Sequence, residues 1–204
     1  MTSLRARQKE DRRNRIVAAA KNLFKMHGYE KTTIEGIAEA AGVSGVTVHN
    51  YYGTKAGVLL ALVIENDKRL IEQLEESLPR DEDDLTELTL EFTRQILDHA
   101  IANLDKQIWR QVIAAVMTGA GSRLTTAYFK LDQQLAFVLV RRIEALQEAG
   151  KLSSEIDAVH LGKALFHLEN ARFMQFISSD DCSREDIEDR LRNDLTALFA
   201  VRAA

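Results

Sequence analysis

Residues 32–55 read TTIEGIAEAAGVSGVTVHNYYGTK, and they contain the strongest structural signal in the chain. Residues 32–35 have the pattern of a capping box, in which a hydroxyl and a carboxylate each satisfy a free amide at the start of a helix. The helix that follows ends at Gly42, and Ser44 is placed to cap a second helix that runs through Tyr52. Two short helices joined by a four-residue turn predict a helix-turn-helix.

Such short helices are marginal in water, so longer helices on either side must hold them. Apolar residues spaced by three and four predict a helix from about Gln8 to His27, with a left-handed cap at Gly28. A further helix is expected from about Thr54 to Leu78. It stops at Pro79, the one proline among 204 residues.

The near absence of proline permits helices through most of the chain and indicates an all-α protein. The polar stretch 79–84 is the best break by composition. Beyond it we expect five more helices, which makes about nine in all. Their expected ranges are 84–102, 105–118, 122–149, 154–178 and 183–201.

Charge is unevenly distributed along the chain. Residues 1–55 carry ten Lys and Arg against five Asp and Glu, a net charge of +5, while the other 149 residues carry 17 against 26, which is −9. A basic end on an acidic body favours contact between the first quarter of the chain and a polyanion, although a solvated charged face is an alternative. We therefore expect an amino-terminal domain over 1–55, with residues 1–8 as a flexible basic arm, and a second domain over 56–204.

Other classes of chemistry lack their sequence signals. One cysteine, Cys182, allows no intrachain disulfide, and no stretch approaches the ~20 apolar residues that span a bilayer. We expect a cytoplasmic protein. The five histidines show no metal-ligand spacing, and no nucleotide-binding loop or nucleophile motif is present. We therefore expect no metal, no cofactor, no catalytic residues and no membrane partner.

The segments 32–44 (TTIEGIAEAAGVS) and 47–55 (TVHNYYGTK) resemble the DNA-binding segment of the TetR (tetracycline repressor) family of bacterial transcriptional regulators. The resemblance covers roughly residues 10–60. It implies a three-helix DNA-binding domain followed by a helical bundle that binds a ligand and dimerises. It also implies DNA contacts from Thr33, Ser44, Gly45, Val46, Thr47, His49, Asn50, Tyr51 and Lys55.

Three of these positions depart from the family pattern. Gly45 replaces a long polar residue, Val46 replaces a frequent glycine, and His49 stands where a tyrosine usually contacts phosphate. Because Gly45 cannot reach a base edge, a larger share of sequence recognition should come from DNA shape, with Arg5 and Arg7 as an arm for the minor groove. Asn50 is suited to bidentate contact with adenine.

The acidic body is expected to hold the effector pocket and the dimer contact that the resemblance implies. Apolar walls with a few polar groups suit a ligand site, and the candidates are Trp109, Tyr128, Phe166, Asn170 and Phe173. Most of these residues would also suit an ordinary core. The nearly all-apolar helix 154–178 needs cover on more than one side, and a second copy would provide it. The predicted dimer contacts are Phe166, Phe173, Ile177, Ile187, Leu191, Leu195 and Leu198.

These observations favour a homodimeric, sequence-specific regulator of transcription that a small-molecule effector of unknown identity releases from a palindromic operator in double-stranded DNA. Repression is the usual mode of the family. Two alternatives stay open: an α-helical enzyme or carrier for an apolar small molecule, and a low-specificity architectural DNA binder.

Overall fold

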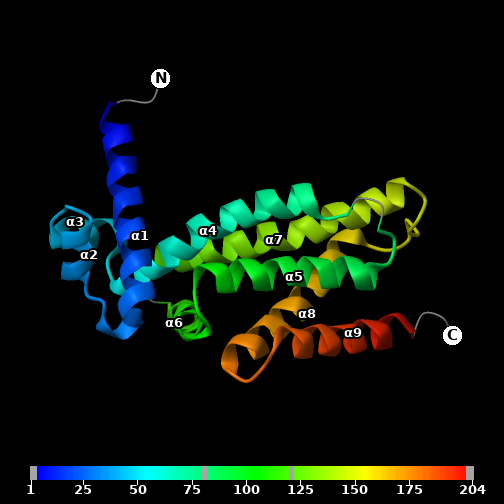
Figure 1. Cartoon of the computed structure of the whole chain (residues 1–204). Coiled ribbons are helices and arrows are strands. Elements are labelled where there is room, and N and C mark those ends of the chain that lie inside the picture. The colour runs from blue at the N-terminus through cyan, green and yellow to red at the C-terminus, as the bar shows by residue number, and fades with distance from the viewer. Residues whose placement is uncertain (1–3, 80–81, 120–121, 201–204) are drawn as a thin grey trace. The chain divides into compact units, whose positions relative to one another are not determined.

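The computed structural model describes residues 4–79, 82–119 and 122–200, which form nine α-helices and no strand (Figure 1). The expected all-α class is therefore confirmed. None of the helices in these ranges is both long and apolar enough to cross a membrane. In chain order the helices are α1 (Leu4–Lys31), α2 (Ile34–Ala40), α3 (Gly45–Tyr52), α4 (Lys55–Ser77), α5 (Leu85–Asn103), α6 (Lys106–Met117), α7 (Ser122–Glu148), α8 (Ala158–Ser178) and α9 (Arg184–Ala200).

The chain divides into two compact units. The first unit comprises residues 1–67 and 107–129, and the second comprises 68–106 and 130–204. Helices α4 and α7 each contribute residues to both units. The domain boundary expected between residues 55 and 56 stays a prediction.

Helix α1 provides a large part of the core of the first unit. It buries Ile16, Ala20 and Phe24, and α2 packs against it. Its first turn includes residues 4–8, which continue the helix where a flexible arm was expected; residues 1–3 lie outside the described ranges. Gly28 interrupts the helical conformation with φ of 77°.

Thr33 caps α2, but the capping box expected over residues 32–35 does not form. The Thr33 hydroxyl accepts a hydrogen bond from the amide of Gly36 at 3.0 Å. Thr32 is buried instead: its hydroxyl donates to the carbonyl of Gly28 at 2.8 Å, and its amide donates to the carbonyl of Tyr29 at 3.2 Å. Because that amide is already satisfied, it has no need of the reciprocal carboxylate that a capping box supplies.

Side chains and backbone groups of α1 hold the helix-turn-helix in place. An Nη1 hydrogen of Arg15 bonds to the carbonyl oxygen of Ala41 at 3.0 Å, which satisfies the end of α2. Gly42 follows with φ of 63°, a left-handed conformation that glycine adopts without steric cost. The Tyr52 hydroxyl donates to the carbonyl of Arg13 at 3.4 Å. Burial raises the pKa of Tyr52, so it stays a neutral core residue.

The second unit is built around α5, α8 and α9. Helix α9 packs on both α5 and α8, and it buries Ile187, Leu191 and Leu195 completely. The rings of Phe92 and Phe166 meet edge to face at 6.5 Å between centroids.

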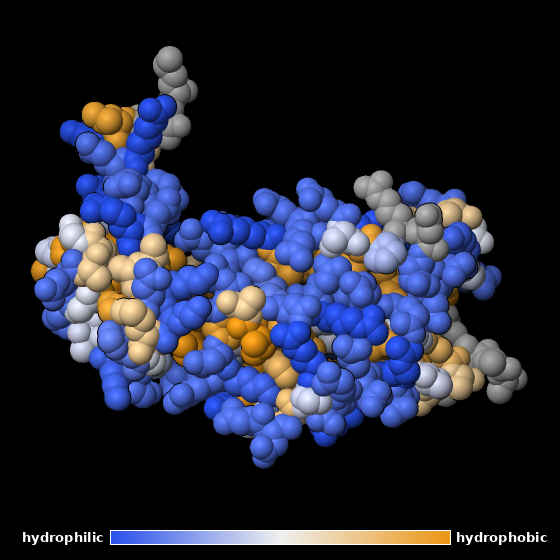
Figure 2. All heavy atoms as spheres, in the orientation of Figure 1, coloured by the Kyte–Doolittle hydropathy of each residue, from blue (hydrophilic) through white to orange (hydrophobic). Residues whose placement is uncertain are grey.

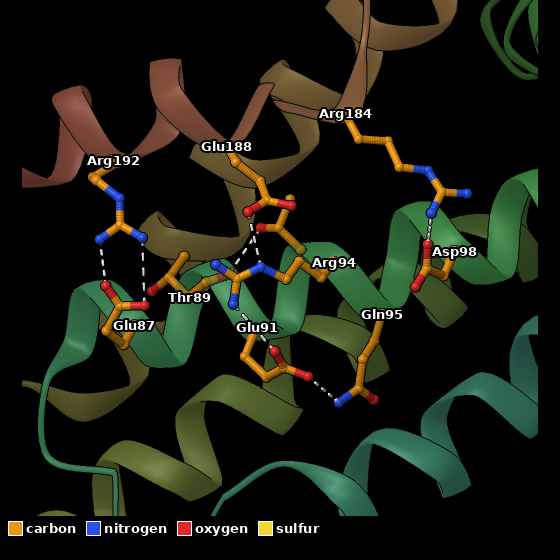
Figure 3. A network of polar contacts seen from close by, with 10 residues as sticks. Glu87, Thr89, Glu91, Arg94, Gln95, Asp98, Arg184, Glu188 and Arg192 are labelled. Atoms are coloured by element: carbon orange, nitrogen blue, oxygen red, sulfur yellow. Dashed lines mark hydrogen bonds and ion pairs between the residues drawn. The ribbon is translucent and has the colours of Figure 1, made fainter. Parts of the chain in front are cut away.

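Ion pairs link α5 to α9 along their length (Figure 3). Arg94 donates from Nε to Glu188 at 2.8 Å, and further pairs join Arg192 to Glu87 and Arg184 to Asp98. The hydrogen bond from Arg192 lowers the pKa of Glu87. These pairs are partly exposed, so solvent screens them and they contribute little to stability.

Helix α8 begins at Ala158, four residues after the predicted start at Ser154. The Asp157 carboxylate caps it by accepting from the amide of His160 at 2.9 Å. The residues before it form a turn that Gln147 holds by donating to two carbonyl oxygens, those of Ser153 and Ile156, at 2.9 and 2.8 Å. Because Gln147 of α7 holds this turn, α8 starts later than the apolar pattern predicted.

Candidate nucleic-acid interface

Helix α3 presents one face to solvent and one to the core of the first unit. His49 and Asn50 are exposed, and Val46 is 70% exposed. Val48 and Tyr52 are buried, as expected for the inward face. A β-carbon built at Gly45 would have no other atom within 4 Å, so this position is open. The helix therefore offers a short row of polar and methyl groups that a base edge in the major groove could meet.

The first turn of α3 is fixed by two hydroxyl groups. The Ser44 hydroxyl accepts from the amide of Thr47 at 3.2 Å, and the two side-chain oxygens lie 2.9 Å apart. Thr47 is half-buried, so its hydroxyl is oriented by its neighbour rather than free to rotate. These hydrogen bonds fix the amino-terminal end of α3, next to its exposed side chains.

Tyr51 connects α3 with the basic side of α1. Its hydroxyl oxygen accepts a hydrogen bond from Nε of Arg12 at 3.4 Å. The phenolic proton of Tyr51 remains for an acceptor such as a phosphate oxygen. The guanidinium of Arg12 lies beside the same position, so the contact places a positive charge next to the outer end of α3.

Lys55, expected to contact phosphate, also has a role inside the unit. Its ammonium donates to the carbonyls of Tyr29 and Glu30 at 2.7 and 3.3 Å and lies 4.2 Å from the centroid of the Tyr29 ring. Burial raises the pKa of Tyr29, which keeps that ring neutral beneath the cation. Two of the three ammonium hydrogens are thus occupied, and one is left for an outside acceptor.

Helix α1 carries basic residues whose common face the sequence alone did not identify. Arg5, Lys9 and Arg12 recur at spacings of four and three, so they share one face, and Arg12 marks that face as the one toward α3. Arg5 and Lys9 make no ion pair within the described ranges, whereas the nearby Arg13 and Arg15 are paired with acidic residues of the same helix. Figure 2 shows the amino-terminal half of α1 as mainly hydrophilic.

The predicted effector residues fall into both units. Trp109 and Tyr128 belong to the first unit and are 5% and 9% exposed. Phe166 and Phe173 are buried in the second unit, where Asn170 is half-buried on the same helix. Their joint role as a pocket stays a prediction.

The predicted dimer residues lie mostly inside a single chain. All but one of them are 6% exposed or less, and Leu198 is 58% exposed. Side chains so deeply buried have almost no surface left to offer a second copy. The buried residues are Phe166, Phe173, Ile177, Ile187, Leu191 and Leu195.

Glu169 on α8 is a buried carboxyl that the sequence reading did not single out. Its side chain is 2% exposed, and its Oε1 has no hydrogen-bond partner within the described part of the chain. Burial, with Asp132 of α7 nearby, raises the pKa of Glu169 to about 8. The sequence feature that could have identified it is an acidic residue between Phe166 and Phe173 on an otherwise apolar face of the helix.

Two other features bear on function. Among the described residues, no group of three or more His, Cys, Asp or Glu side chains could hold a metal ion. A surface groove of about 370 Å³ lies in the second unit and includes none of the predicted effector residues. It is lined by Lys68, Ile71, Glu72, Glu75, Gln134, Phe137 and Arg141.

Comparison with known families supports the helix-turn-helix interpretation. Residues 16–62 match the family described as "Bacterial regulatory proteins, tetR family". The matched range begins in the buried half of α1 and ends in α4, so it includes all of α2 and α3.

Individual relatives match the same end of the chain. The HTH-type transcriptional regulator HbdR of Aromatoleum sp. is 36% identical over 77 residues, which are 38% of this chain and 32% of that protein. The HTH-type transcriptional repressor AcnR of Corynebacterium glutamicum is 34% identical over 65 residues, 32% of this chain and 35% of that protein. The chain thus aligns with about a third of the length of these relatives.

Solved structures extend the likeness of the fold to most of the chain. The Thermus thermophilus FadR structure, a TetR-family repressor in complex with lauroyl-CoA, superimposes with a TM-score of 0.72 at 24% identity. The superposition covers 92% of this chain and 93% of that one. At this identity the likeness establishes the fold of the second unit's helices and leaves their ligand unassigned.

Proposed function

We propose that this chain, whose residues 16–62 match the tetR family of bacterial regulatory proteins, is a homodimeric regulator of transcription that binds a palindromic operator. The observation that carries the proposal is the geometry of α3. Its inward side chains are buried while His49, Asn50 and Val46 face solvent on a capped helix. A helix held in this way is suited to the major groove, which is wide enough to admit it.

Sequence recognition is assigned to the exposed row of α3. Asn50 has the donor and acceptor needed for bidentate contact with adenine, and Val46 offers methyl contact to thymine. Thr47 is oriented by Ser44 and is proposed to reach a phosphate or a thymine methyl. Gly45 offers no side chain, so the row is short and DNA shape carries more of the discrimination.

Affinity is assigned to contacts with phosphate, which position a protein without reading sequence. Arg5, Lys9 and Arg12 extend the positive surface from Tyr51 along α1. Since these residues are already helical, we place Arg5 on a phosphate rather than on a flexible minor-groove arm. Further phosphate contacts are proposed for Thr33, Ser44, His49, Tyr51 and the remaining N–H of Lys55.

The dimer is proposed to form through exposed positions of α8 and α9 rather than through their buried ones. On α8, His160, Ala164, His167 and Ala171 are exposed at spacings of four and three and therefore lie on one face. Two-fold pairing would place the same patch of each copy against the other. Half-sites read one helical turn apart, ~34–36 Å, would follow from the resulting symmetry.

A small-molecule effector is proposed to act through the second unit, and repression is the proposed mode. The complex of Thermus thermophilus FadR with lauroyl-CoA shows that this fold can hold a ligand. An effector shifts the equilibrium between DNA-binding and released states only by its different affinity for the two. No catalytic reaction is assigned, and the proposed site of action is the cytoplasm.

Selection of duplexes from random DNA by the purified full-length protein, at low and raised salt, tests the proposal. An inverted repeat enriched at both salt concentrations supports the regulator. Binding without enrichment would favour the architectural DNA binder instead. Failure to bind any duplex, together with tight small-molecule binding or turnover, would favour the carrier or enzyme.

A further inference from the structure

Glu169 occupies the interior of the second unit without a partner to offset its burial. A carboxyl removed from water costs free energy unless hydrogen bonds or an opposite charge compensate. Its side chain is 2% exposed, and Oε1 accepts no hydrogen bond within the described ranges. A well-packed apolar side chain of similar volume is commonly neutral or stabilising at such positions, so a contribution to the core does not account for this carboxyl.

The groups facing Glu169 provide negative charge and aromatic surface. Asp132 of α7 is close enough to act electrostatically on it. Phe166 and Phe173 precede and follow it by three and four residues, so they lie on the same face of α8, and both are buried. Phe166 in turn packs against Phe92 of α5.

The basic residues of α8 on either side of Glu169 interact with other groups. Arg172 lies three residues beyond Glu169, but it is paired with Asp194 of α9 and donates to Gln175 at 2.7 Å. Lys163 lies over the ring of Phe137 of α7, 5.4 Å from its centroid. Among the described residues, Glu169 therefore has an acidic neighbour on α7 and no basic partner.

From this arrangement we propose that Glu169 anchors the effector, and that the effector is an organic cation with an apolar or aromatic body. The inference rests on the proposed function, because it names the chemical class of the regulator's ligand. Two carboxyl groups attract an ammonium or amidinium group, and aromatic rings add cation–π attraction. The same two carboxyl groups oppose an anionic ligand.

Binding at this position also suggests how the signal begins. Gly162 lies two turns before Glu169 on α8, at a close contact with α7. A β-carbon built there would be 2.7 Å from both Cγ2 and the amide nitrogen of Val140. Because Glu169 is buried and α8 lies in close contact with α7 at Gly162, a ligand that reaches Glu169 has to separate these helices. The packing of α8 on α7 would thus differ between the free and bound states.

The test uses three probes with the same body: 4-phenylbutylammonium, 4-phenylbutan-1-ol and 4-phenylbutanoate. Binding to the full-length protein is measured by calorimetry and by the shift in Tm. We expect the ammonium to bind at least tenfold more tightly than the alcohol, and the carboxylate not to bind. Equal binding of alcohol and ammonium, or binding of none of the three, would overturn the proposal.

Glu169→Gln should weaken ammonium binding at least tenfold and leave alcohol binding unchanged. Glu144→Gln is the matched control, since it removes one exposed carboxylate of α7 in the same unit and should change nothing. If Glu169→Gln does not fold by circular dichroism, Asp132→Asn takes its place and should weaken the ammonium several-fold. Unchanged ammonium affinity in the folded variant contradicts the assignment.

Proton linkage provides a readout that a merely structural carboxyl would not give. Since Glu169 must ionise to pair with a cation, ammonium affinity should rise up to tenfold per pH unit from pH 6 to 8, with release of a proton. A flat profile counts against the proposal. Operator binding by the same preparations separates the two hypotheses. Glu169-dependent ammonium binding without DNA binding would contradict only the proposed function. DNA binding without Glu169-dependent ammonium binding would contradict only this inference.

Discussion

The ammonium of Lys55 lies 2.7 Å from the carbonyl oxygen of Tyr29 and 4.2 Å from the centroid of the ring of the same residue. The first residue of α4 is therefore tied to the last turn of α1 across the helix-turn-helix. A residue at the edge of the proposed DNA surface thus contributes to folding as well as to binding, and its substitution has two separable consequences.

Lys55→Gln should lower the free energy of unfolding by about 1–2 kcal/mol, because two hydrogen bonds from a charged donor are lost. It should also weaken binding to all duplexes alike and reduce the salt slope by about one, as expected for a phosphate contact. Urea unfolding and salt titrations of DNA affinity measure the two effects. Lys31→Gln, an exposed lysine of α1, is the control for stability. A change in preferred sequence would contradict the assignment.

The basic face of α1 gives a second prediction. Lys9→Gln should weaken binding to specific and random duplexes equally and lower the salt slope by about one, without loss of stability. Lys25→Gln removes the same charge from an exposed position farther along α1 and should have little effect. Fluorescence anisotropy at several salt concentrations provides the measurement, and equal effects of the two substitutions would remove the special role of this face.

Ser44 should matter through helix capping. Ser44→Ala removes the acceptor for the Thr47 amide and the partner of the Thr47 hydroxyl, at a cost of about 1 kcal/mol of unfolding free energy. Ser154→Ala, at an exposed position outside any helix, is the matched control. Chemical denaturation monitored by circular dichroism distinguishes them. An unchanged midpoint in Ser44→Ala would show that the cap contributes nothing measurable.

Glu169 predicts an unusual dependence of stability on pH. Its pKa of about 8 in the folded chain exceeds that of an unfolded glutamate, so the folded state holds the proton between about pH 4.5 and 8 while the unfolded state releases it. Stability should therefore fall as pH rises through this window, at up to about 1.4 kcal/mol per pH unit. Glu169→Gln should flatten this part of the profile, as measured by urea unfolding from pH 5 to 9. An identical profile in the variant would contradict the burial of an ionisable group.

The helix-turn-helix was predictable because its signals are local. The capping residue of α3, its inward and outward faces and the left-handed glycines between helices all follow from spacing within a few residues. The Thr33 cap at the start of α2 is equally local, but the reciprocal carboxylate bond of a capping box does not form, because the amide of Thr32 already donates to the carbonyl of Tyr29.

Features that depend on distant parts of the chain were not predictable. The start of α8 is set by Gln147 of α7, which holds the preceding turn. The apolar positions of α9 suggested a dimer contact, yet Ile187, Leu191 and Leu195 are covered by helices of the same chain. Periodicity identifies which face of a helix is buried but not which surface covers it. The isolation of Glu169 likewise depends on what α7 and α9 bring near it.

The outward face of α3 is proposed to read DNA sequence, and duplex selection with Asn50→Ala beside the unaltered protein tests this proposal. Both proteins should select an inverted repeat with the same spacing, and the variant should lose its preference at one adenine–thymine pair in each half-site, a loss worth about 1–3 kcal/mol. An identical preference at every position of the repeat would contradict it.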